Sequence, residues 1–222
     1  MKSLKTVAIA LCAGIVMAGC NNLAKGTAIG AAGGAALGAI VGKIAGNTAV
    51  GAAVGTAVGA GTGALIGKHM DKVKAQAQAV QNAQVEQITD ANGFEGVKVT
   101  FDSGILFATN SSTLSSSANN CISQIANVLK QNSDVDVAIF GHTDSTGSDA
   151  INDPLSLKRA QSVQNKLVSL GVTTIKRVEG QGSHNPVADN STAEGKKQNR
   201  RVEVYMYASE AMINAANNGT LQ

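Results

Sequence analysis

The sequence has no tryptophan and little of several other residue types. Among 222 residues there are four phenylalanines, two tyrosines and two prolines, and 15% of the side chains are charged. This charge content excludes a disordered polyelectrolyte, and so few aromatics argue against two large independent cores. The formal net charge is +3. Two lysines lie in a leading segment that we expect to be removed, so the remaining chain is nearly neutral. It therefore lacks the excess of positive charge that is typical of proteins that bind nucleic acid.

The first twenty residues have the pattern of an export signal. Two lysines precede an apolar run that is too short to span a bilayer, so we expect residues 1–19 to be a signal peptide. The order Met17-Ala18-Gly19-Cys20 resembles the lipobox of bacterial lipoproteins, which implies acylation of Cys20 and a lipidated N-terminus over residues 20–25. In those lipoproteins a residue other than Asp after the cysteine, here Asn21, goes with sorting to the outer membrane. The alternative is an ordinary signal peptide cleaved nearby.

The three cysteines do not make a disulfide framework. Cys12 would leave with the signal peptide and Cys20 would carry the lipid, so Cys121 has no partner within the chain. Cys121 lies in a helical apolar stripe, which predicts a small buried side chain rather than a nucleophile.

Glycine recurs every four residues in two rows over residues 26–67. This spacing puts each row on one helix face, where missing side chains let two backbones approach closely. Asn47-Thr48 lies between the rows, so we expect a glycine-zipper helical hairpin. Each row is about as long as the hydrocarbon layer of a bilayer is thick, yet no tryptophan or tyrosine marks an interface. Two placements stay open: a hairpin inserted in the membrane, or a helical element in the periplasm through which the chain forms homo-oligomers.

The remainder of the chain divides into a spacer and a compact unit. Residues 68–95, rich in Ala, Gln and Lys, predict a helical spacer or linker that ends in turn residues. From residue 96 onward strand-like and helix-like periodicities alternate, which predicts an α+β fold of βαβαββ type, a mixed sheet with helices on one face. The expected strands are residues 97–101, 105–107, 135–140, 177–180 and 201–207, and the expected helices are residues 112–130 and a helix capped by Asp153 that begins at Pro154 and ends before Gly171. The C-terminal tail, residues 208–222, shows no usable pattern.

An ordered series of residues within 96–207 resembles the OmpA-like peptidoglycan-binding domain. The resemblance covers about half of the chain, and with the lipobox and the glycine zipper the whole chain is similar to small OmpA-family lipoproteins of the outer membrane. The series is Gly141-His142-Thr143-Asp144, Gly147, Asn152, Leu155-Ser156, Arg159-Ala160, Val163, Gly180, Gly182, Pro186, Asn190, Thr192, Gly195 and Asn199-Arg200-Arg201-Val202-Glu203.

This resemblance implies a ligand, the meso-diaminopimelate of the peptidoglycan stem peptide. Its side chain ends in an ammonium and a carboxylate on one carbon, so a selective pocket needs an anion and a cation close together. Asp144 and Arg159 match the family's binding pair, and the N-terminus of the helix that carries Arg159 in its second turn would face the same carboxylate. Judged from the residues alone, the two could equally form an internal salt bridge. The positions that match secondary contacts of the family are Thr143, Asn152, Asn110 and Arg200.

Other chemistry finds no support in the sequence. The histidines, His69, His142 and His184, are isolated and lack zinc-ligand spacing, and no calcium loop, nucleophile elbow or phosphate loop is present. We therefore expect no catalysis, no cofactor and no metal.

Three function classes remain. The first is a non-enzymatic tether, in which a lipid-anchored chain of the outer membrane binds peptidoglycan in the periplasm. The second is an ion-motor stator component, a family that shares the domain; it needs a proton-carrying acid within its membrane helix, and residues 26–67 contain none. The third is a glycine-zipper oligomer that forms pores or assembly platforms and uses the wall domain as an anchor.

Overall fold

The computed structural model describes residues 60–89 and 94–221. The predicted signal peptide, the lipidation site at Cys20 and most of the glycine-rich segment 26–67 lie outside the described residues. Within the described part of the chain, no helix combines the length and the apolar composition needed to cross a membrane.

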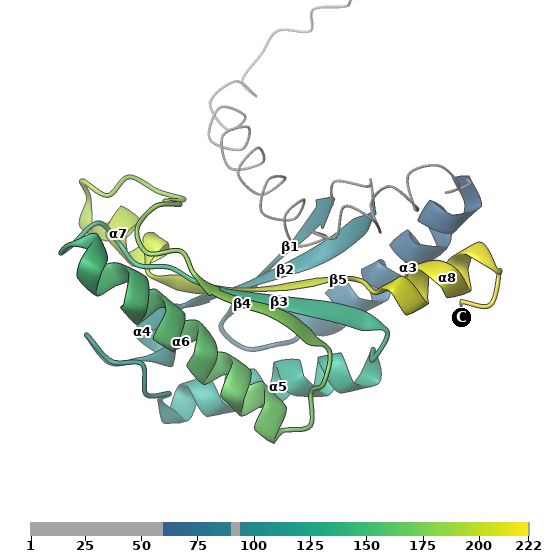
Figure 1. Ribbon diagram of the computed structural model, residues 1–222, viewed down its shortest axis with the longest axis horizontal. Helices are drawn as coiled ribbons and strands as arrows, with labels where there is room; N and C mark the ends of the chain where they lie inside the picture. The colour runs from purple at the N-terminus through teal and green to yellow at the C-terminus, as the bar shows by residue number, and fades with distance from the viewer. Residues whose placement is uncertain (1–59, 90–93, 222) are drawn as a thin grey trace, which may run out of the picture.

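A five-stranded mixed sheet organises the described chain (Figure 1). Its strand order is β1-β2-β5-β3-β4; β3 and β4 run parallel, and every other neighbouring pair is antiparallel. The order places the start of β5 between the ends of β2 and β3, because Asp102 pairs with Arg201 and Gly141 with Val202. The strands are β1 (Ala83–Thr89), β2 (Glu95–Asp102), β3 (Val135–Gly141), β4 (Ile175–Gly180) and β5 (Arg201–Ala208).

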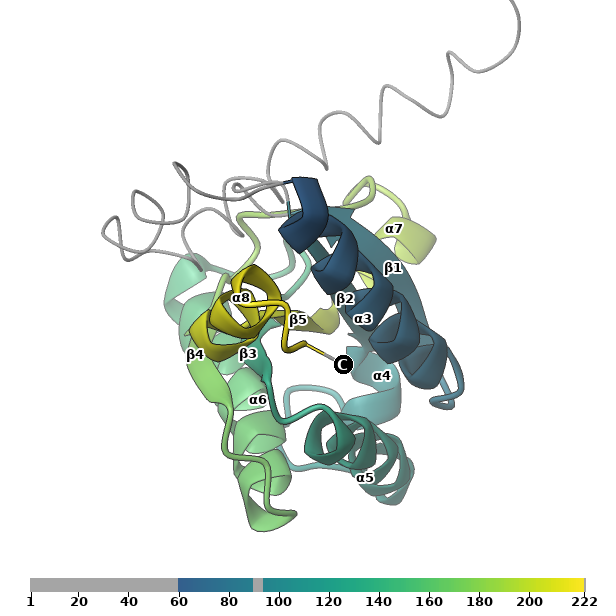
Figure 2. The ribbon, with the colours of Figure 1, turned by 90° about the vertical axis from the view of Figure 1, so that its right-hand side faces the viewer.

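The long helices share one face of this sheet (Figures 1 and 2). Buried side chains from α3, α5, α6 and α8 join alternate residues of the strands in one apolar core. The predicted α+β fold, a mixed sheet with helices on one face, is thus confirmed. The helices of the described residues are α3 (Ala60–Gln78), α4 (Ser103–Leu106), α5 (Ser116–Gln131), α6 (Asp149–Ser169), α7 (Ala193–Asn199) and α8 (Glu210–Asn217).

The two faces of the sheet differ in chemistry. Along β5, Val202, Val204 and Met206 belong to the helix-covered core, whereas Tyr205 belongs to a small cluster with Ala138 and Phe140 on the opposite face. This is the period of two expected of a strand. Neighbouring residues of β5 therefore serve different surfaces.

The prediction of a helical spacer is wrong for its second half. Residues 83–89 form β1, an edge strand paired antiparallel with β2. The helix before it, α3, is part of the core, because it buries a stripe at three- and four-residue spacing made of Ile66, Met70, Val73 and Ala77. Polar residues separate the few apolar ones in both elements, so composition alone suggested a solvated helix; packing on the sheet decides the structure instead.

Two local predictions near the pocket are also wrong. Residues 105–107 do not continue β2, because Asp102 Oδ1 accepts a hydrogen bond from Gly104 N at 2.6 Å and starts the single turn of α4. Asp153 does not cap α6, which begins one turn earlier with Ser148 in the cap position and contains Pro154 inside it. Pro154 is the sixth residue of this helix and has no N–H to donate within it.

The remaining elements of the core agree with or extend the sequence analysis. Ser115 caps α5 by accepting a hydrogen bond from Ala118 N at 3.0 Å, and Cys121 is buried on that helix, as predicted. The C-terminal tail contains α8, which packs beside α3, and Thr62 of α3 donates to Asn217 Oδ1 at 2.9 Å (Figure 2).

Candidate binding pocket

A hollow of about 460 Å³ lies where β2 and β3 end and β5 begins. All six ligand-binding residues predicted from the sequence line it, although they come from four separate segments of the chain. The lining consists of Ser103, Gly104, Phe107, Ala108, Thr109, Asn110, Thr143, Asp144, Thr146, Asn152, Leu155, Arg159 and Arg200.

The segment that carries Thr143 and Asp144 is fixed at the carboxyl end of β3. His142 N donates to Arg201 O at 2.9 Å, and Thr143 N donates to Gly182 O at 2.8 Å. Gly141 allows α6 to approach, because a Cβ at that position would lie 2.1 Å from Ser156 O. The loop is therefore held by β5 and by the loop after β4.

Asp144 is paired with Arg200 and not with Arg159. Its Oδ2 contacts Arg200 Nη1 at 2.5 Å, and its Oδ1 accepts a hydrogen bond from Thr146 N at 2.8 Å. Burial alone would raise the pKa of Asp144, but the hydrogen bonds from Arg200 and Thr146 outweigh it and leave this pKa below its usual value. The carboxylate is thus ionised at neutral pH, and the internal Asp144–Arg159 salt bridge left open by the sequence is not formed.

Arg159 is a buried guanidinium without an acidic partner among the described residues. The residue is 5% exposed, its Nε donates to Ser111 O at 3.0 Å, and its Cζ lies 5.3 Å from the centroid of the Phe107 ring. Burial and, after it, the charge of Arg200 lower the pKa of Arg159, although an arginine so placed stays protonated. The carbonyl and the ring orient the side chain while its Nη groups make no hydrogen bond to the described chain.

Arg159 lies further along α6 than the sequence analysis expected. This arginine is in the third turn of α6 rather than in the second, and it lies about 15 Å along the helix axis from Asp149. The expected position of Arg159 in the second turn is therefore wrong, because α6 begins about one turn earlier than Pro154, while Asn152 of its first turn lines the same hollow as Arg159.

The secondary residues differ in what they do. Asn152 Nδ2 donates to Thr146 O at 3.1 Å, so this side chain holds the loop around Asp144. Asn110 lies in the left-handed region with φ 54°, which positions a tight turn at the pocket rim. The Thr143 hydroxyl and the Ser103 hydroxyl are buried and have no hydrogen-bond partner in the described chain. Ser103 was missed by the sequence analysis, which placed it before an expected strand.

A side-chain clamp ties the loop after β4 to the pocket. Asn199 Oδ1 accepts hydrogen bonds from Val187 N and Ala188 N at 2.7 and 3.0 Å, and its Nδ2 donates to Asn190 Oδ1 at 2.9 Å. Asn190 Oδ1 also accepts from Ser145 N at 3.2 Å, next to Asp144. Asn190 and Asn199 therefore act on the site through backbone groups.

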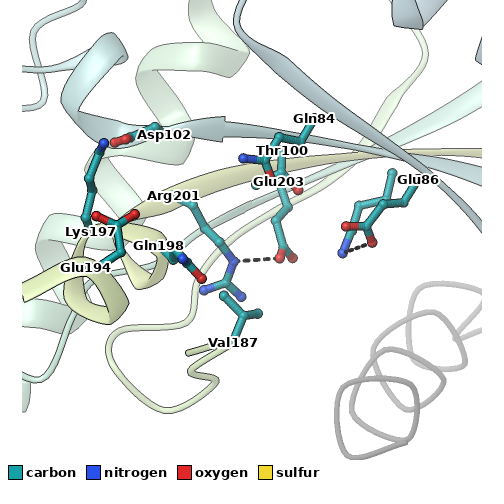
Figure 3. Close-up of a pocket in the computed structure, with 11 residues that line it drawn as sticks. Gln84, Glu86, Thr100, Asp102, Val187, Glu194, Lys197, Gln198, Arg201 and Glu203 are labelled. Atoms are coloured by element: carbon teal, nitrogen blue, oxygen red, sulfur yellow. Dashed lines mark hydrogen bonds and ion pairs between the residues drawn. The ribbon is translucent and has the colours of Figure 1, made fainter. Parts of the chain in front are cut away.

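A second hollow, of about 410 Å³, lies on the other side of the sheet ends (Figure 3). Arg201 Nε donates to Glu203 Oε1 at 2.7 Å, and Lys98 Nζ pairs with Glu86 Oε2 at 2.7 Å. Burial would raise the pKa of Glu203, but His142 and Arg201 outweigh it and lower that pKa far below its usual range. Because the buried charges of this hollow already neutralise one another, it is a weaker candidate for binding a charged ligand.

One more cluster arises only from the fold. Asp149, Asp153 and His184 lie together at the surface, with one potential ligand atom of each within 4.8 Å of the others. His184 Nε2 and Asp153 Oδ1 are already paired at 3.1 Å. His184 is thus not isolated in space as it is in sequence.

Family comparison supports the resemblance on which the site prediction rested. Residues 106–200 match the OmpA family, and residues 1–71 match the YMGG-like Gly-zipper family. The described chain carries an OmpA family domain. The predicted combination of this domain with a glycine zipper is confirmed.

Among curated proteins, the chain is 36% identical over 140 residues to the probable lipoprotein YiaD of Escherichia coli, covering 63% of each chain. It is 48% identical over 85 residues to the peptidoglycan-binding protein ArfA of Mycobacterium tuberculosis, covering 37% of this chain and 26% of ArfA. The chain therefore spans less than two thirds of the length of these relatives.

Solved structures share the fold. The cell wall anchor of the T6SS from Pseudomonas aeruginosa aligns with 28% identity and a TM-score of 0.51, covering 63% of this chain and 97% of the anchor. A putative MotB-like protein from Desulfovibrio vulgaris aligns with a TM-score of 0.57 at 19% identity, covering 67% and 96%, which shows the fold alone.

Proposed function

We propose that the pocket of Asp144 and Arg159 binds peptidoglycan non-catalytically, through the free amino acid centre of meso-diaminopimelate in the stem peptide. The observation that supports this most is the state of Arg159: a buried cation with no acidic partner in the described chain, lining the same hollow as an ionised carboxylate. Buried charges in proteins are normally paired. A ligand carboxylate would supply the missing partner.

The ligand's two charged groups fit the two ends of this site. Arg159 offers its Nη donors to a carboxylate, and the carboxylate of Asp144 offers acceptor positions to an ammonium beside the two that Arg200 and Thr146 use. Lysine has the ammonium but no carboxylate at that end of its side chain. The pocket should therefore distinguish stems with diaminopimelate from stems with lysine.

The relatives support the same class of function. ArfA is named a peptidoglycan-binding protein, and the structural relative from Pseudomonas aeruginosa is titled a cell wall anchor. YiaD is named a probable lipoprotein. With the lipobox at Cys20, these names favour a lipid-anchored protein of the outer membrane whose OmpA family domain lies in the periplasm and ties the membrane to the wall.

Calorimetric titration of the full-length chain in detergent with meso-diaminopimelate and with L-lysine tests this function. We expect Asp144→Asn and Arg159→Gln to weaken diaminopimelate binding at least about tenfold, the effect of losing one charge-assisted hydrogen bond. Lys158→Gln is the matched control, because Lys158 is the exposed neighbour of Arg159 on α6. Wild-type affinity in both pocket variants would rule out the site. A shortened chain that begins at residue 90 is unsuitable for this test, because it lacks α3 and β1.

A second role rests on the N-terminal segment. The match of residues 1–71 to the YMGG-like Gly-zipper family favours association of copies of this chain through glycine faces, as an oligomer, a pore or an assembly platform. Leakage of dye from liposomes by the full-length chain, compared with a chain lacking residues 26–59, separates pore formation from tethering. Leakage that depends on residues 26–59 would support pore formation. If the full-length chain caused no leakage, pore formation would be rejected and tethering would remain the proposed function.

A further inference from the structure

The binding pocket carries more positive than negative charge. Its charged lining residues are two arginines, Arg159 and Arg200, and one acid, Asp144. A diaminopimelate centre with one ammonium and one carboxylate is neutral, so binding it would leave the net charge of +1 unchanged. Because charges in a partly buried hollow are screened less than surface charges, a ligand with one additional carboxylate would fit this site better.

The two guanidiniums lie at different depths. Arg159 is 5% exposed, whereas the side chain of Arg200 is 39% exposed, and the side chain of Asp144 is 9% exposed. Arg200 uses only Nη1 on Asp144, and within the described residues its Nε and Nη2 make no hydrogen bond. An arginine has five donors in one plane, so Arg200, which lines the hollow, holds Asp144 and still has unpaired donors for a ligand.

We infer that this pocket prefers a stem peptide that ends at diaminopimelate, because Arg200 binds the second, chain-terminal carboxylate of that residue. The inference rests on the function proposed above. In a stem that continues, the same carboxyl group is part of an amide and carries no charge. In a stem that ends there, two carboxylates and one ammonium meet two guanidiniums and one carboxylate, and the charges cancel.

The unpartnered hydroxyls of the pocket support a ligand with more acceptors than one amino acid centre. The Ser103 and Thr143 hydroxyls are buried without a hydrogen-bond partner in the described chain, and both residues line the hollow. Ser103 N donates to Arg200 O at 2.9 Å, so this serine is fixed next to the backbone of Arg200. A hydroxyl donates to a carboxylate, which removes the cost of leaving the group unpaired.

Three synthetic tripeptides, L-Ala-γ-D-Glu-meso-diaminopimelate and its two monoamides, test the inference by calorimetric titration of the full-length chain. One amide replaces the chain-terminal carboxylate and the other replaces the carboxylate of the free amino acid centre. We expect the chain-terminal amide to bind about five- to tenfold more weakly than the free tripeptide, a range reduced because Arg200 is partly solvated. Equal affinities for the free tripeptide and this amide would overturn the preference.

The Arg200→Gln variant assigns the effect to one residue. We expect its affinities for the free tripeptide and the chain-terminal amide to differ less than about twofold, while Lys197→Gln, which removes an exposed cation of α7, keeps the wild-type ratio. Arg200→Lys should keep part of the ratio. A wild-type ratio in Arg200→Gln would overturn the role of Arg200. Because each comparison is a ratio of ligands on one variant, a change in folded fraction cancels.

The same titrations separate this inference from the proposed function. Loss of binding on amidation of the free amino acid centre, together with equal binding of the free tripeptide and the chain-terminal amide, would keep the proposed function and reject only the inference. If none of the three tripeptides bound, the proposed function itself would fail and the inference with it.

Discussion

The substitution Ile66→Ala tests whether α3 belongs to the folded domain. Ile66 is fully buried in the core that α3 shares with the sheet, whereas its neighbour Leu65 is 37% exposed. The two residues are isomers in consecutive positions of one helix, and alanine keeps the helix in both cases. Leu65→Ala is therefore a matched control for everything except burial.

Burial sets the size of the expected effect. Truncating a fully buried isoleucine to alanine costs about 2–5 kcal/mol, which combines lost transfer free energy with a residual cavity. A substitution at the surface changes stability by about 0.5 kcal/mol or less. For a domain of this size, the difference corresponds to a melting temperature lowered by about 4–20 °C in Ile66→Ala and nearly unchanged in Leu65→Ala.

Urea unfolding followed by far-ultraviolet circular dichroism measures both free energies on the full-length chain. A lower midpoint with an unchanged slope for Ile66→Ala would show lost stability of the same cooperative unit. If both variants unfolded at the wild-type midpoint, α3 would not pack on the sheet, and the helix would be the detached spacer that the sequence suggested.

Two further outcomes follow from the strand that carries the pocket loop. Gly141→Ala places a Cβ 2.1 Å from Ser156 O, so α6 must shift; we expect a loss of about 1–3 kcal/mol in urea unfolding and weaker diaminopimelate binding. Gly61→Ala in α3, whose Cβ meets nothing within 4 Å, should lower neither stability nor binding. Burial lowers the pKa of His142 despite the facing carboxylate of Glu203. As pH decreases, His142 is therefore protonated in the unfolded chain before it is protonated in the folded one, so the free energy of unfolding should fall as pH decreases from about 6.5. An equally steep fall in His142→Asn would contradict this.

The sequence identified the pocket residues because their types and spacing match a known family, while it could not identify their partners. The pair of Asp144 and Arg200 joins residues 56 positions apart. That contact exists because β5 lies between β2 and β3, and the strand order is a property of the whole sheet rather than of either segment. Ser103 was missed for a related reason, since the cap formed by Asp102 turns the chain into α4 where apolar residues suggested a longer strand.

Edge elements were the other part of the fold that the sequence could not predict. β1 packs Ala83 and Val85 against the core and Ile88 against the small cluster on the opposite face, while its other residues are polar, so its strand period is faint. Its pairing with β2 stabilises it, and such pairing leaves no local mark on the sequence. By contrast β3, with buried residues along nearly its whole length, was found with correct bounds to within one residue.

The charge of the pocket depends on the register of β5. Consecutive residues of a strand point to opposite faces, so Arg201 stays behind the sheet with Glu203 while Arg200, one residue earlier, enters the pocket. The carbonyl groups of the same two arginines accept hydrogen bonds from Ser103 N and His142 N. These bonds fix the start of α4 and the loop after β3, which line the pocket on either side of Arg200. A shift of β5 by one residue would therefore exchange the positions of the two guanidiniums and break both backbone contacts, so the register that aligns the core also determines which arginine lines the pocket.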